Sequence, residues 1–214
     1  MINQPFQRKN ALNDSFDSLR LRVEAGRSLP LAICITSATA ADGAGHVAYG
    51  LASAFASSGA RTLAVLESEL PQALDRPAPY VDGLASVVRG AVVSQPSGVD
   101  TVCMRSGGIP ERQADARAAM LSLRGTYQVI VLEAGEAATR SAMLQRAKLA
   151  DIAILAVRLG RPRQAADRAL AERLEALGVA VLGVVSSAGD PGATAVRQKP
   201  TRTLPDPLAA PSRS

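Results

Sequence analysis

The sequence predicts an α/β domain in which a doubly wound, mostly parallel sheet is covered by helices on both faces. Short apolar runs recur along the chain without alternating polar residues, which is typical of strands buried on both faces. Helical segments separate these runs, and parallel neighbours need such crossover connections. The expected strands lie at residues 31–36, 62–66, 101–104, 129–132, 152–157 and 179–185.

Helical segments precede and separate these strands, and the first of them has a clear apolar stripe. Phe16, Leu19 and Val23 recur at helical spacing. Residues 70–81 contain three prolines and are expected to form a loop. The expected helices lie at residues 14–25, 46–58, 83–89, 111–123, 141–147 and 163–177.

The chain divides into three parts by composition. Its last part is rich in Pro, Arg and Ser and lacks periodicity, which indicates disorder. We therefore expect an N-terminal segment with an amphipathic helix at 1–28, the α/β domain at 29–188 and a disordered tail at 189–214.

Charge and composition narrow the class of protein. The net charge of +5 comes from arginines dispersed along the chain, which favours solvated helix faces over specific nucleic-acid binding. No apolar run approaches the ~20 residues of a membrane span, and residues 1–10 lack the apolar core of a signal peptide. Cys34 and Cys103 lie in apolar runs, as buried reduced thiols do. We expect a cytoplasmic protein.

A small-residue loop joins the first strand to the following helix, where phosphate groups are often held by main-chain amides. A working phosphate loop adds a Lys for the outer phosphates and a Ser or Thr for Mg²⁺. Neither is present here, so the loop is either an incomplete phosphate site or a glycine-rich turn. The residues concerned are Asp42, Gly43, Ala44, Gly45 and His46.

Acidic residues follow two of the strands. Glu67 and Glu69 follow the second strand and Glu133 follows the fourth, so a parallel sheet would place them near the loop at one edge. Glu67 and Glu69 could bind a cation or be solvated charges, and Glu133 could be a relic of the same site or a neighbour of a helix cap. With no Lys beside them, these acids and Asp42 should repel the phosphates of a nucleotide unless a cation bridges them. His46, the only histidine, has no partner residues for a metal site, and we expect it to be exposed to solvent.

A longer stretch, TSATAADGAGHVAYGLASAFASSGARTLAVLESEL at residues 36–70, resembles the ATPase domain of the bacterial tyrosine kinases (BY-kinases) of capsule and exopolysaccharide export. These are relatives of the MinD/ParA group of P-loop ATPases. The family pattern reads TSA, EGKST, NLA and a strand ending in D-x-D. The resemblance extends over residues 14–188 and includes GLASVVRG at 83–90, YQVIVLE at 127–133 and LGVVSS at 182–187.

The departures from the family pattern fall on the chemical residues. Ala44, Gly45 and His46 replace the family's Lys, Ser and Thr, which makes the first motif degenerate. Glu67, Glu69 and Glu133 replace Asp, each moving its carboxylate by about one C–C bond, ~1.5 Å. The tail after Gly189 contains no Tyr, whereas the family's tail carries a tyrosine cluster.

The resemblance therefore implies a non-catalytic pseudokinase that acts with a membrane polysaccharide co-polymerase in exopolysaccharide synthesis or export. Such a protein would lie in the cytoplasm, held at the inner membrane by its partner, and would need no cofactor. One alternative is a divergent, active ATPase or protein-tyrosine kinase that uses ATP and Mg²⁺. Another is a MinD/ParA-like positioning module attracted to membrane or DNA by its arginines.

The segment DSFDSLR at residues 14–20 resembles the kinases' E-A-x-R-x-x-R segment, which packs against the neighbouring subunit of their ring. Asp14 and Arg20 match its first and last charged positions, while Asp17 reverses the charge of the middle one. The resemblance implies a homo-oligomer through Asp14 and Arg20, and the charge reversal opposes it.

Overall fold

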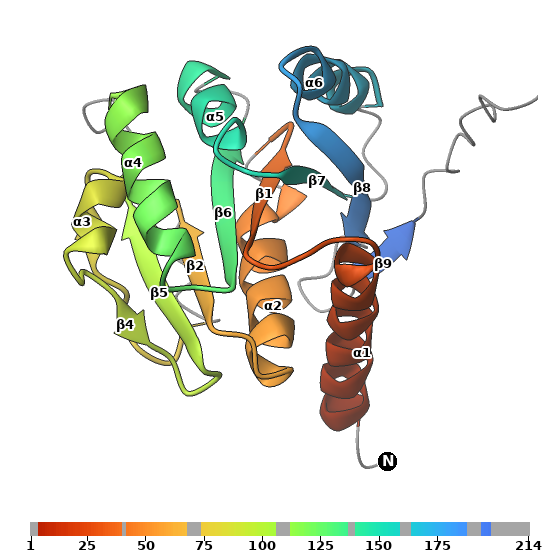
Figure 1. The fold of residues 1–214 in the computed structure, drawn as a ribbon. Coiled ribbons are helices and arrows are strands. Elements are labelled where there is room, and N and C mark those ends of the chain that lie inside the picture. The colour runs from red at the N-terminus through yellow and green to blue at the C-terminus, as the bar shows by residue number, and fades with distance from the viewer. Residues whose placement is uncertain are drawn as a thin grey trace, which may run out of the picture.

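A single mixed sheet forms the centre of the fold (Figure 1). The structure is a computed structural model and describes residues 4–39, 42–67, 74–105, 112–136, 140–158, 164–187 and 194–197. Within these residues the sheet has nine strands in the order β3-β5-β2-β6-β1-β7-β8-β9, with β4 paired to β5. The strands are β1 (Leu31–Ser37), β2 (Thr62–Leu66), β3 (Tyr80–Val81), β4 (Val93–Ser94), β5 (Val99–Met104), β6 (Val129–Glu136), β7 (Ile152–Arg158), β8 (Ala180–Ser187) and β9 (Thr194–Arg197).

The central strands are all parallel. β1 lies between β6 and β7, and β2 lies between β5 and β6. Only β4 and β9 run antiparallel to their neighbours, β5 and β8. The carboxyl ends of β1, β2 and β6 therefore meet at one edge of the sheet, where ligands bind in open α/β folds.

Helices cover both faces of the sheet. Three buried clusters of side chains show that α1 and α2 pack on one face and α3 to α6 on the other. The predicted doubly wound α/β fold is thus confirmed. The helices are α1 (Gln4–Glu24), α2 (Ala44–Ser57), α3 (Leu84–Val88), α4 (Gln113–Arg124), α5 (Arg140–Ala147) and α6 (Gln164–Ala176).

The structure departs from the expected elements at the edges of the sheet and in α1, which begins at Gln4 rather than at the expected residue 14. Tyr80–Val81 forms β3 at the end of the expected 70–81 loop, and β4 was not expected. β9 lies inside 189–214, where a disordered tail is expected, because Thr194–Arg197 pairs with the exposed edge of β8. The other residues of that tail lie outside the described residues. These strands have two to four residues each, too few for a periodic pattern to show in the sequence.

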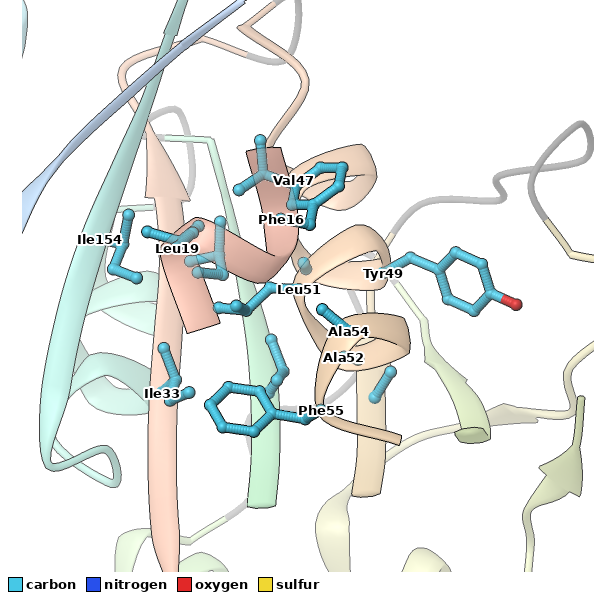
Figure 2. Packing of buried hydrophobic residues seen from close by; sticks show 14 of the residues in the cluster. Phe16, Leu19, Ile33, Val47, Tyr49, Leu51, Ala52, Ala54, Phe55 and Ile154 are labelled. Atoms are coloured by element: carbon cyan, nitrogen blue, oxygen red, sulfur yellow. The ribbon is translucent and has the colours of Figure 1, made fainter. Parts of the chain in front are cut away.

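Helix α1 packs closely on α2 through the predicted apolar stripe. Phe16, Leu19 and Val23 are all buried, and Figure 2 shows Phe16 and Leu19 beside Val47 and Leu51 of α2. A Cβ atom on Gly50 of α2 would lie only 2.3 Å from the Phe16 ring. The missing side chain at position 50 therefore lets α1 approach α2.

Both cysteines are buried and neither forms a disulfide, as the sequence indicates. Burial raises the pKa of the Cys34 thiol to about 12, although the nearby Arg146 guanidinium acts in the opposite direction. The thiol is therefore neutral at physiological pH. Among the described residues, no helix combines the length and apolar character that crossing a bilayer requires.

Candidate functional site

The loop between β1 and α2 leads directly into the helix N-terminus at the carboxyl edge of the sheet. Gly43 is the N-cap of α2 and has a left-handed backbone (φ 78°, ψ 32°), a conformation that favours glycine. Among the described residues, no side chain forms a hydrogen bond that caps this end of the helix. The main chain therefore retains a geometry that favours anions, because first-turn amides at a helix N-terminus carry partial positive charge.

The side chain of Asp42 serves the loop itself. Asp42 is only 5% exposed, and its Oδ2 accepts hydrogen bonds from the Thr39 amide (3.0 Å) and the Thr39 hydroxyl (2.7 Å). The Ser37 hydroxyl donates to the Thr39 carbonyl oxygen at 2.8 Å. Asp42 thus braces the loop from inside, and both of its bonds to Thr39 would compete with any metal ion for the same oxygen.

His46 lies in the first turn of α2 and is half-buried, so the expectation of an exposed histidine is wrong. Its ring lies 6.4 Å from the Phe16 ring, centroid to centroid, because α1 covers this part of α2. Its Nε2 is buried and has no hydrogen-bond partner within the part of the chain that the structure describes. Burial lowers the pKa of His46, so the imidazole is neutral at pH 7 and cannot replace the missing lysine's charge.

Glu67 and Glu133 come together at the edge. Glu133 of β6 is 5% exposed, and its Oε2 accepts a hydrogen bond from the Glu67 amide at 3.0 Å. The Glu67 carboxylate forms an ion pair with Arg146 in the last turn of α5. Glu69, the other predicted acid, lies outside the described residues.

Arg146 is the site residue that sequence reasoning missed. It was one of many dispersed arginines, and only the packing of α5 on β6 and β1 brings its guanidinium to Glu67. Burial lowers the pKa of Arg146, yet a guanidinium keeps its charge at neutral pH. Glu67 therefore has a cationic neighbour that the sequence did not indicate. In the described part of the chain, no cluster of three or more His, Cys, Asp or Glu residues could hold a metal.

The two residues predicted at a subunit interface lie on α1. Asp14 is exposed, whereas the Arg20 guanidinium pairs with Glu24 at 2.8 Å and Asp17 at 3.5 Å within the same helix. Asp17, which reverses the charge of the family's middle Arg, is thus an internal partner of Arg20. The interface itself stays a prediction.

Comparison with known proteins finds solved structures with a similar fold. No protein-family model matches the chain, and no curated protein matches it. Among solved structures, the chimerical protein CapA2B2 is similar with a TM-score of 0.67 and 22% identity, covering 81% of this chain and 83% of that chain. The kinase domain of the Escherichia coli tyrosine kinase ETK is similar with a TM-score of 0.64 and 18% identity, covering 81% and 74%.

A septum site-determining protein is a further match. MinD from Pyrococcus horikoshii, solved with Mg-ADP, gives a TM-score of 0.52 and 20% identity, covering 72% of this chain and 68% of that chain. All three identities are low, so the similarity establishes architecture rather than activity. The chain has the fold shared by tyrosine-kinase domains of the ETK type and MinD-type P-loop ATPases.

Proposed function

We propose that this protein is a non-catalytic relative of the BY-kinases that acts on the cytoplasmic side of a membrane polysaccharide co-polymerase in exopolysaccharide synthesis or export. One observation carries the non-catalytic part. Each described acid of the site has a partner in the same chain: Asp42 accepts hydrogen bonds from Thr39, Glu133 accepts one from the Glu67 amide, and Glu67 forms an ion pair with Arg146.

The loop also lacks the groups that hold a nucleotide and its metal. Ala44, Gly45 and His46 stand where the resemblance places a lysine and two hydroxyl residues. Each lost contact to a charged group costs about 1.5–3 kcal/mol. Two such losses weaken nucleotide binding by roughly 10²- to 10⁴-fold. A metal would in addition have to displace the internal donors from the acids. We therefore propose that the protein works without ATP or Mg²⁺.

The proposed partner follows from the family resemblance, and the shared fold supports it. Similar structures include the ETK kinase domain and the BceF tyrosine kinase domain. Tyr49, Tyr80 and Tyr127 are the only tyrosines, and all three precede the tail, which argues against a role through tail autophosphorylation. A scaffold that retains the domain surface would serve such a partner without turnover.

A second candidate is a divergent ATPase, and the α2 N-terminus favours it. The first-turn amides that follow Gly43 are not capped by any side chain of the described residues, a geometry in which a phosphate group can be bound. MinD from Pyrococcus horikoshii, with a similar fold, was solved with Mg-ADP. This candidate requires nucleotide binding without a loop lysine.

The scaffold role is tested by purifying a tagged co-polymerase from detergent-solubilised membranes. We expect this protein to co-purify equally well with and without enzymatic removal of ATP, because binding needs no nucleotide. We also expect deletion of its gene to lower exopolysaccharide output. Loss of co-purification on nucleotide removal would contradict the non-catalytic role, and unchanged output after deletion would contradict the pathway.

A further inference from the structure

An ion pair joins two elements that are distant in sequence. Arg146 lies in the last turn of α5, and Glu67 directly follows β2. The strand β6 lies between β2 and β1 in the sheet, and α5 packs on β6. The pair therefore connects α5, which follows β6 in the chain, to the end of β2, a different strand of the sheet.

The pair is largely removed from water. The Arg146 and Glu67 side chains are 20% and 13% exposed, whereas the Arg168–Glu172 pair on α6 is 82% and 61% exposed. Arg146 also lies near the fully buried Cys34 of β1. Burying a charge costs free energy unless an opposite charge compensates it. Removing either side chain of the Arg146–Glu67 pair should therefore destabilise the folded protein.

A second hydrogen bond extends the connection. The Glu67 main-chain amide donates to Glu133 of β6, so Arg146, Glu67 and Glu133 link α5, β2 and β6 at the carboxyl edge of the sheet. Glu133 belongs to the part of β6 that pairs with Ile35 of β1, just before the loop. The linkage therefore lies beside the candidate site.

We propose that Arg146 is a built-in counter-ion of this site: its guanidinium holds the Glu67 carboxylate against external cations and locks α5 to the β2–β6 edge. The inference rests on the proposed function, since it names what neutralises an acid in a site that works without a metal. It is nevertheless testable by stability, without nucleotide or partner. An external cation would have to break the internal pair before it could use Glu67.

A double-mutant cycle tests the lock. We expect Arg146→Met and Glu67→Gln each to raise the unfolding equilibrium constant on the order of 10²-fold, because each removes one member of a mostly buried ion pair. The unfolding equilibrium constant of the double variant should lie within about tenfold of the wild-type constant, because neutral side chains replace both charges of the pair. Arg168→Met on the exposed pair is the matched control and should change the constant less than about fivefold.

The proposal would be overturned if Arg146→Met and Glu67→Gln had additive effects on the free energy of unfolding, because the two residues would then act independently. If Arg146→Met does not fold, the double variant decides: cooperative unfolding of the double variant supports the lock, and its failure to fold overturns it. A separate arm measures the Tm of the wild type in about 10 mM MgCl₂ or MnCl₂, where we expect no rise. A rise that Glu67→Gln abolishes would show that an external cation reaches this carboxylate.

These outcomes are independent of the proposed function. Coupled stability with tight nucleotide binding would leave the lock in place and contradict the non-catalytic role. Additive effects of the two substitutions together with no nucleotide binding would contradict the lock and leave the non-catalytic role in place.

Discussion

Replacing Phe16 with Ala is expected to lower the free energy of unfolding by about 3–5 kcal/mol, the usual cost of removing a buried phenylalanine. Phe16 is 5% exposed and packs against Gly50 and His46 of α2. Because α1 is an end segment, the loss is limited by the free energy with which α1 packs on the domain. Urea denaturation measures the loss, and limited proteolysis between residues 25 and 30 reports whether α1 has separated.

Gly50→Ala provides the matched test of the same contact. In the wild type the added methyl would lie 2.3 Å from the Phe16 ring, so overpacking should outweigh the helix preference of Ala and destabilise the protein. In a Phe16→Ala background the clash is gone, and the same change should stabilise α2 by up to ~1 kcal/mol. An effect of the same sign in both backgrounds would contradict this account of the α1–α2 contact.

Asp42→Ala is expected to lower the free energy of unfolding by about 2–4 kcal/mol, because Thr39 loses two hydrogen bonds to a carboxylate at once. Both bonds lie in the loop before α2, and Asp42 is nearly buried. Chemical denaturation measures the loss, and hydrogen exchange at the Thr39 amide should accelerate. This result would identify Asp42 as a structural residue of the loop.

Asp42→Asn is the control, since its side-chain oxygen can still accept a hydrogen bond from Thr39. We expect a loss of no more than ~1 kcal/mol, because the bonds persist without charge. If Asp42→Ala changed stability by less than about 0.5 kcal/mol, the brace would be dispensable and the carboxylate would be available to a ligand.

The sequence predicted the central strands and the long helices because their apolar patterns are local. β1 and β2 are mostly apolar and buried from end to end, and the α1 stripe of Phe16, Leu19 and Val23 has helical spacing. β4 and β9 were missed because strands of two and four residues are too short to show a periodic pattern of their own.

The candidate site was predictable in position and less so in its contacts. Parallel strands place their carboxyl ends at one edge, which explains why Glu67 and Glu133 meet there. The sequence RSAMLQRA of α5 gives no sign that Arg146 will reach Glu67, since that depends on how α5 packs on the sheet. The burial of His46 likewise depends on α1, which covers α2 from elsewhere in the chain.

The most direct test of the central claim is a calorimetric titration of the purified protein with ATP and with ADP in the presence of Mg²⁺. A site whose acids are held by internal donors and whose loop lacks a lysine should show no binding up to millimolar nucleotide, about −4 kcal/mol or weaker. Binding at micromolar concentration would contradict the non-catalytic role and support the divergent ATPase.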